Sequence, residues 1–205
     1  MLIENKDICA AEIKHMDNNT LRNHITKILD LPEEDLSLLV SCVTYRELKK
    51  GEILLNEGDV SRSFYLVNNG YLRTYYNKDT AAINLHFAFE GEFTANLQGI
   101  KTKKGSENII VAGENASVWI FDLGVINKYF DTRHQINIFM RRVAFRMLLV
   151  MEEHGNLFKI YTPTERYRYI EKNNPRLLQR ISLSHVASYL GIARETLSRI
   201  RAKAN

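Results

Sequence analysis

Long apolar runs and a signal sequence are both missing from this chain of 205 residues. No stretch approaches the roughly 18 consecutive apolar residues of a membrane-spanning helix, and the start of the chain lacks the basic segment and apolar run of a signal peptide. We therefore expect a cytoplasmic protein with no membrane partner. The length allows two domains but not three, because a compact domain typically holds about 100 to 200 residues.

Cysteine is also scarce, since only Cys9 and Cys42 occur. Metal sites built on cysteine usually contain C-x-x-C pairs, and an iron–sulfur cluster usually needs four cysteine ligands. A disulfide would be unusual in a reducing compartment. The sequence thus predicts two ordinary thiols, no metal site and no iron–sulfur cluster.

Charge is unevenly distributed, although its formal sum is only +4. Residues 161–205 contain nine Lys or Arg and three Asp or Glu, which is +6, whereas residues 1–160 contain 19 and 21, which is −2. A basic segment beside a near-neutral body favours a nucleic-acid partner, because Lys and Arg release phosphate counterions. A solvated basic face explains the charge alone equally well.

Apolar periodicity divides the first part of the chain into helices and strands. Apolar spacings of three and four predict helices at 18–29 and 32–43, the second with three acidic residues in its first turn. From Val43 to about Leu123, short runs rich in Val, Ile, Tyr and Phe are cut by turn residues and recurring glycines. This block predicts an antiparallel β-barrel or jelly roll. The glycines need no role beyond forming turns.

A long helix is predicted at about 132–158. Its apolar residues alternate steps of four and three, which keeps one stripe on a single face as in a coiled coil, and only His154 interrupts it. The helix contains more apolar residues than this one stripe needs. We therefore expect it to pack on the barrel and against a second copy of the chain. The expected dimer residues are Ile136, Met140, Val143, Met147, Val150 and Leu157.

Another helix is predicted to begin after Thr162. Pro163 suits the first helical position, and Glu165 completes a capping box with Thr162. The helix should end before Asn174, because a residue that precedes proline is disfavoured in the helical region. These signals divide the chain into the segments 1–131, 132–160 and 161–205.

Residues 181–201, ISLSHVASYLGIARETLSRIR, match a helix-turn-helix position by position. Ala187 is small where the two helices cross, and Gly191 falls where the turn needs a left-handed backbone. An ordinary helix hairpin can contain the same pair. The outer face of the second helix favours a DNA reader, because Arg can bond guanine and Glu can accept a hydrogen bond from cytosine. The candidate DNA-binding residues are Arg194, Glu195, Thr196, Ser198, Arg199 and Lys203.

The chain resembles the catabolite-activator/fumarate-nitrate-regulator (Crp/Fnr) transcription factors over essentially its whole length. The resemblance consists of a barrel, a long helix and the terminal ARETLSRI at 193–200, in that order. The resemblance implies that residues matching Arg194, Glu195 and Arg199 read bases in double-stranded DNA with a two-fold-symmetric operator. RNA polymerase and a small-molecule effector are further partners of such a homodimeric regulator. In these terms, 1–131 is a cyclic-nucleotide-binding-like effector domain, 132–160 the dimerisation helix and 161–205 the DNA-binding domain.

The FEGE stretch at 89–92 also matches the family. In the cyclic-AMP-binding members, a Gly-Glu pair and a later Arg-Ser-Ala run hold the nucleotide. Here the matching run, at about 106–108, has no arginine, and its glutamate would repel a phosphate. Cyclic AMP is therefore disfavoured, and the effector and any cofactor are unknown. The candidate effector-pocket residues are Gly91, Glu92, Ser106, Glu107 and Asn108.

Two other ligand possibilities stay open. Lysines in the loop between these stretches either substitute for the phosphate arginine as point charges or are simply solvated; they are Lys101, Lys103 and Lys104. Haem is compatible with the presence of histidines, but none has a telling context, and ordinary surface or core histidines explain them better. They are His15, His24, His86, His134, His154 and His185.

Two departures from the family concern DNA binding. Ala193, directly before the second helix, is a poor N-cap and gives up about 1 kcal/mol relative to Ser or Thr. No β-hairpin wing follows that helix in the sequence, so we expect fewer phosphate contacts and a greater dependence on dimerisation. The predicted fold is therefore α+β, with N-terminal helices, an antiparallel barrel or jelly roll, a long dimerisation helix and a small all-α helix-turn-helix domain without a wing.

The alternative function is a small-molecule sensor that acts through protein contacts and has a degenerate DNA-binding domain. An enzyme is not expected. Glu90 and Glu92 are paired carboxylates without a partner base, and no nucleophile–base spacing or metal motif is visible.

Overall fold

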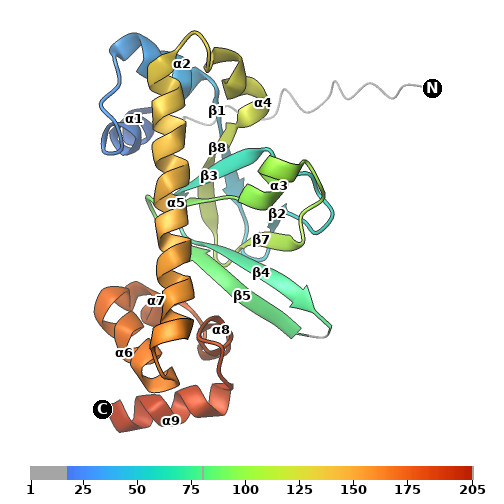
Figure 1. The fold of residues 1–205 in the computed structure, drawn as a ribbon, viewed down its shortest axis with the longest axis vertical. Coiled ribbons are helices and arrows are strands. Elements are labelled where there is room, and N and C mark those ends of the chain that lie inside the picture. Colours follow the sequence, from blue (N-terminus) through green and yellow to red (C-terminus); the bar gives the residue numbers. More distant parts are fainter. Residues whose placement is uncertain (1–17, 80, 205) are drawn as a thin grey trace, which may run out of the picture.

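The computed structural model describes residues 18–79 and 81–204 and has three parts along its long axis (Figure 1). Two short helices lie at one end, two antiparallel sheets form the middle, and four helices form the other end. The helix α5 (His134–Ile160) runs beside all three parts. The predicted α+β fold class is confirmed, whereas Cys9 and His15 lie outside the described residues.

The first two helices are shorter than the sequence predicts. They are α1 (Asn18–Thr26) and α2 (Glu33–Ser41). Leu21, Ile25 and Leu39 are fully buried in one core with the barrel and α5. The acidic first turn of α2 interacts favourably with the helix dipole, and Arg22 of α1 pairs with Glu33 at 2.8 Å.

Two four-stranded antiparallel sheets form the barrel, as the alternation of apolar runs and turns predicts. Buried apolar side chains from both sheets, including Leu72, Ile110 and Val118, fill the space between them. The first sheet has the order β1 (Val43–Leu48), β8 (Ala116–Asp122), β3 (Ser63–Asn69) and β6 (Phe93–Thr94). The second has the order β2 (Ile53–Leu55), β7 (Asn108–Ala112), β4 (Leu72–Lys78) and β5 (Ala81–Ala88).

Short helices occur where the sequence predicts loop. Asn96 caps α3 (Leu97–Thr102) by accepting a hydrogen bond from the backbone N of Gly99 at 3.0 Å. Lys103 ends this helix in the left-handed conformation. Beyond β8, α4 (Leu123–Ile126) and a 3-10 turn (Asn127–Tyr129) lead into α5. These helices have too few residues to show a helical period.

The predicted dimer face of α5 is wrong. Most of the expected residues lie against the chain's own core; Ile136, Met140, Val143, Met147 and Leu157 are buried, and only Val150 is exposed. The exposed large apolar residues of α5 are Phe145, Leu148, Leu149, Val150 and Met151 in its middle and Phe158 and Ile160 near its end. Both stripes have helical spacing, so the period cannot distinguish the inner face from the outer one.

Four helices complete the chain, and the predicted start of the first is confirmed. The backbone N of Thr162 donates to Glu165 Oε2 at 2.8 Å in a capping box, and Pro163 is the first residue of α6. Their bounds are α6 (Pro163–Asn173), α7 (Pro175–Arg180), α8 (Leu183–Tyr189) and α9 (Arg194–Ala204).

The C-terminal helices share a hydrophobic core with the barrel. Tyr71, Phe87 and Phe89 of the barrel belong to the same buried cluster as Tyr189 and Leu197. The expected boundary near residue 161 therefore marks where one set of helices follows another in the sequence. It does not separate two hydrophobic cores, because side chains from before and after it pack together. No helix within 18–79 or 81–204 is both long and apolar enough to cross a membrane.

Candidate nucleic-acid interface

A tight turn joins α8 to α9. Ser182 caps α8 by accepting a hydrogen bond from the backbone N of His185 at 3.3 Å. Gly191 follows the helix with φ +66°, and a Cβ built on it would lie 2.8 Å from Phe158 Cε1. The predicted left-handed glycine is thus present, and the close approach of α5 adds a second reason for glycine at this position.

The inner side of α9 is fixed by burial. Leu197 is fully buried, together with Val186, Ala187 and Leu190 of the preceding helix and turn. The two helices therefore have the apolar contacts that the motif predicts. The opposite side of α9 cannot turn inward without exposing Leu197.

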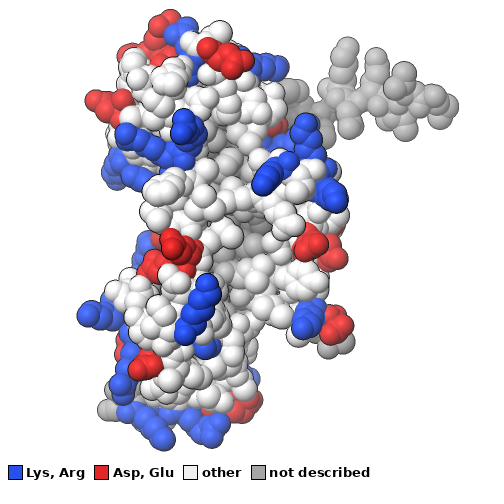
Figure 2. All heavy atoms as spheres, in the orientation of Figure 1, with Lys and Arg blue, Asp and Glu red and all other residues white. Residues whose placement is uncertain are grey.

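The outer side of α9 presents most of the candidate DNA-binding residues to solvent. Figure 2 shows Lys and Arg gathered at the end of the molecule that α9 forms. Thr196 is half-buried and accepts a hydrogen bond from Arg199 Nη2 at 3.3 Å. The exposed candidates are Arg194, Glu195, Ser198, Arg199 and Lys203.

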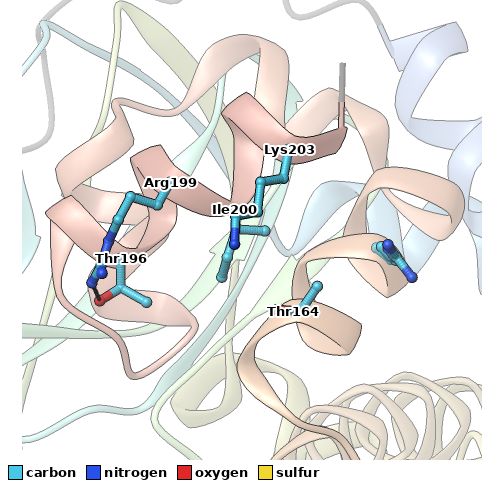
Figure 3. Close-up of a pocket in the computed structure, with 6 residues that line it drawn as sticks. Thr164, Thr196, Arg199, Ile200 and Lys203 are labelled. Carbon is cyan, nitrogen blue, oxygen red and sulfur yellow. Dashed lines mark hydrogen bonds between the residues drawn. The ribbon is translucent and has the colours of Figure 1, made fainter.

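A basic groove of about 300 Å³ separates α9 from α6 (Figure 3). Its lining contains three cations and no acid, together with two threonine hydroxyls. Sequence reasoning missed the contribution of α6, because nothing in the sequence shows which face of α6 meets α9. The lining residues are Thr164, Arg168, Thr196, Arg199, Ile200 and Lys203.

The structure does not bring the five effector-pocket candidates together. Glu92 lies at the surface and accepts hydrogen bonds from the backbone N of Phe89 at 3.0 Å and from Arg176 of α7 at 2.8 Å. Gly91 forms a left-handed turn between β5 and β6, and a Cβ built there would meet His24. Glu107 is exposed. The Gly-Glu pair therefore faces the helices that pack on the barrel, which corrects the expectation from the FEGE match.

Ser106 instead belongs to a buried polar cluster beside α3. Asn96 Nδ2 donates to Ser106 Oγ at 2.6 Å, and Ser106 Oγ donates to the carbonyl of Asn108 at 2.6 Å. The Ser61 hydroxyl is buried and has no hydrogen-bond partner in the described part of the chain. These groups are uncharged, so they offer hydrogen bonds to a ligand but no cation for a phosphate.

The loop lysines and the remaining cysteine do not form a site either. Lys101, Lys103 and Lys104 are exposed, and Cys42 is a half-buried free thiol. Within 18–79 and 81–204, no group of three or more His, Cys, Asp or Glu is arranged to hold a metal ion.

Three histidines lie where the barrel, α5 and α8 meet. His154 Nε2 is 3.3 Å from the carbonyl O of Tyr189, and Arg73 Nη1 is 3.1 Å from His185 Nε2. Burial lowers the pKa of His154 and of His185, and the guanidinium of Arg73 lowers the pKa of His185 further. Burial lowers the pKa of His86 to about 4. All three rings are therefore neutral near pH 7.

Comparison with known proteins identifies the barrel and the whole fold. Residues 45–133 match the cyclic nucleotide-binding domain family. No curated protein is significantly similar to the chain. FixK2 from Bradyrhizobium japonicum is 21% identical with a TM-score of 0.67, and the match covers 78% of this chain and 83% of that one.

Two further solved structures share the fold. The c-di-GMP-responsive global regulator CLP of Xanthomonas campestris is 15% identical with a TM-score of 0.66, covering 84% of this chain and 91% of that one. The catabolite activator protein of Thermus thermophilus is 18% identical with a TM-score of 0.53, covering 86% and 84%. The resemblance predicted from the sequence is thus confirmed at the level of the fold.

Proposed function

We propose that this chain, in which a cyclic nucleotide-binding domain at 45–133 forms part of a Crp/Fnr fold, is a sequence-specific DNA-binding transcription regulator. The exposed outer face of α9 carries the proposal. Arg194, Glu195 and Arg199 lie on this face, opposite the buried Leu197. Arginine can bond the guanine O6 and N7 together, and glutamate can accept from the cytosine N4. A protein with this function works in the cytoplasm.

The groove between α6 and α9 fits the phosphate backbone beside the bases. Arg168 and Lys203 face it from the two helices, and the hydroxyl of Thr164 adds a neutral hydrogen-bond donor. Contacts to phosphate fix register on the duplex without reading sequence. We assign Lys203 and Arg168 to phosphate contacts and the outer face of α9 to base contacts.

A second copy of the chain is the partner that the free face of α5 fits. Phe145 and Leu148 are 60% and 52% exposed, three residues apart on one side of the helix. Arg141 and Glu152 continue the same side with steps of four, so a charged residue borders the apolar centre at each end. A parallel pairing of two α5 helices brings both recognition helices to the same end of the dimer, where they can meet an inverted repeat. RNA polymerase would be a further partner of an activator.

Cyclic AMP remains disfavoured as the effector. The buried polar cluster of Asn96, Ser106 and Ser61 contains no cation for a cyclic phosphate. Titration calorimetry with cyclic AMP should therefore give no binding heat at concentrations that saturate a cyclic-AMP-dependent regulator, and saturable binding would contradict this expectation. An effector, if the barrel takes one, would be recognised by neutral hydrogen bonds.

Random-site selection followed by gel shift tests the function. The full-length protein should enrich an inverted repeat, and its affinity should fall as salt rises, because phosphate contacts release counterions. No enrichment together with absent or salt-independent DNA binding would overturn the proposal. That outcome would favour a sensor acting through protein contacts, which the poor N-cap residue Ala193 before α9 also allows.

A further inference from the structure

Two arginines of α7 bind the turn between β5 and β6. Arg180 donates to both oxygens of Glu90, with Nη1–Oε2 2.7 Å and Nη2–Oε1 2.9 Å. Arg176 Nη2 donates to Glu92 Oε1 at 2.8 Å. Two parallel bonds between planar groups fix orientation as well as distance. The acids of the FEGE stretch are therefore used to hold α7 against the barrel.

Arg180 is held from several sides. Nη2 also donates to Glu114 Oε1, and the guanidinium carbon lies 5.2 Å from the ring centre of Phe89 and 5.7 Å from that of Tyr71. Glu90 Oε1 accepts a further bond from the backbone N of Gly70 at 2.9 Å. The hydrogen bond from Arg180 is the largest cause of the lowered pKa of Glu90. We call Arg180, Glu90, Glu114, Phe89 and Tyr71 the Arg180 cluster.

A second contact holds α8 on β5. The backbone N of Asn84 donates to Ser188 Oγ at 3.0 Å, and Asn84 Nδ2 donates to the carbonyl of His185 at 3.0 Å. Arg73 Nη1 donates to Asn84 Oδ1 at 3.2 Å. Asn84 is only 2% exposed. Its donors find these partners only while α8 is packed on the barrel, so this packing is specific rather than a loose apolar contact.

The Arg180 cluster lies apart from the surface proposed for DNA. None of its residues lines the groove between α6 and α9. Arg180 is two residues before Ser182, which caps α8. Fixing Arg180 therefore fixes where the helix-turn-helix begins without contributing a contact to bases or phosphates.

We propose that Arg180 is a positioning residue that sets which half-site spacing the protein selects. The proposal rests on the proposed function, because it concerns how two recognition helices of a dimer are placed. With the cluster intact, the barrel holds α8 and α9 in one orientation, and only inverted repeats of matching spacing meet both helices. Without it, the contacts of Arg176 and Asn84 with the barrel remain, but no bidentate pair fixes the end of α7, and the terminal helices adopt a wider range of orientations.

The test compares Arg180→Met with Arg46→Met. Methionine keeps apolar packing on Phe89 and removes the charge, and Arg46 forms a similar ion pair of 2.8 Å with Glu52 wholly within the barrel. Each protein is titrated with inverted repeats whose spacer is lengthened or shortened by single base pairs. Amide hydrogen exchange of β5 in the free protein is measured in parallel.

We expect R180M to bind all spacings with similar Kd values while keeping the base preference within each half-site. Exchange at Asn84 should become faster by roughly threefold or more, as expected when a half-exposed ion-pair network is lost. R46M should behave as the wild type in both measurements. The conservative variant Arg180→Lys, which keeps a cation between Glu90 and Glu114, should retain part of the spacing preference, which a merely structural loss would not allow.

The outcomes separate the two proposals. A wild type that selects a spaced inverted repeat, with an R180M variant that keeps the same spacing preference, overturns the role of Arg180 alone. Unchanged exchange at Asn84 in R180M also overturns it. A wild type that selects no inverted repeat overturns the proposed function itself.

Discussion

The imidazole of His154 stacks on the phenol ring of Tyr189, with ring centres 4.2 Å apart and planes 18° from parallel. His154 belongs to α5 and Tyr189 to α8, so the stack joins the long helix to the first helix of the helix-turn-helix. Tyr189 also meets Phe87 of β5 edge-on at 5.4 Å. This aromatic cluster thus connects α5, the terminal helices and the barrel, and it contains a titratable imidazole.

Acid should weaken the protein through this junction. The pKa of His86 is lowered to about 4, and the pKa values of His154 and His185 are lowered too. The unfolded chain therefore binds protons more readily, so stability is full above about pH 6.5 and declines as the pH falls toward 4. Urea unfolding followed by circular dichroism should show a loss of about 2 kcal/mol between pH 7 and 5.

A matched pair of variants isolates the histidines. His86→Gln should reduce this pH dependence, whereas His134→Gln, at an exposed position, should leave it unchanged. Carboxylates with lowered pKa, such as Glu90, lose their contribution below about pH 4.5 and do not interfere in this window. Equal stability at pH 7 and 5 would contradict the prediction.

Two glycine-to-alanine changes should shift the melting temperature in opposite directions. Gly191→Ala places a Cβ 2.8 Å from Phe158 on a backbone with φ +66°, and we expect a loss of at least about 1 to 2 kcal/mol. Gly155→Ala lies within α5 with no atom within 4 Å of the new Cβ, and we expect a gain of about 0.5 to 1 kcal/mol. Thermal unfolding of both variants checks this, and a neutral Gly191→Ala would show that the turn relaxes freely.

Arg199→Ala and Lys203→Ala should weaken DNA binding in different ways. Loss of a base contact at Arg199 should cost about 1 to 3 kcal/mol on the preferred site and relax the preference at one position. Loss of Lys203 should weaken binding to all sequences alike and reduce the salt slope by about one. Gel shifts over a salt series with single-base variants of the site measure both. If both variants showed the same change in base preference and in salt slope, the assignment of Arg199 to bases and Lys203 to phosphates would be wrong.

Arg168→Ala extends this comparison to α6. Arg168 lines the groove together with Lys203, so its loss should also lower the salt slope without changing base preference. The same salt series measures it. A variant with the slope of the wild type would place the DNA backbone away from α6.

Replacing Leu148 with Glu should separate the proposed dimer without unfolding the chain. Leu148 is 52% exposed on the free face of α5, so a charge there meets only the partner copy. Val60→Glu is the control, because Val60 is equally exposed on the barrel away from α5. Sedimentation velocity should give a monomer for L148E and a dimer for V60E. A dimeric L148E would require another interface.

Local signals in the sequence predict local structure well. The capping box of Thr162 and Glu165 and the left-handed Gly191 act within a few residues, and both are present in the structure. The faces of α5 could not be assigned, because apolar residues occur on both sides and only tertiary packing selects the inner one. The candidate base-reading residues are exposed as expected, and their role stays a prediction.

Contacts between distant residues account for the rest. Glu90 and Arg180 are 90 residues apart in the sequence, and Glu92 and Arg176 are 84 apart. Pairs at such separations produce no periodic pattern in the sequence from which the contact could be predicted. A short match such as FEGE indicates a place in the fold but not the partner of its charges. Arg168 was missed for the same reason, since only the packing of α6 on α9 brings it to the groove.

The continuity of α5 has a mechanical consequence. At 1.5 Å per residue, its 27 residues form a rod about 40 Å long, which packs on the N-terminal helices and the barrel toward one end and on the terminal helices toward the other. A tilt of about 5° at the anchored end displaces the far end by roughly 3.5 Å, which is one base-pair step along a DNA strand. In the proposed regulator, the rod would thus amplify a small rearrangement of the barrel into a whole unit of register on the double helix.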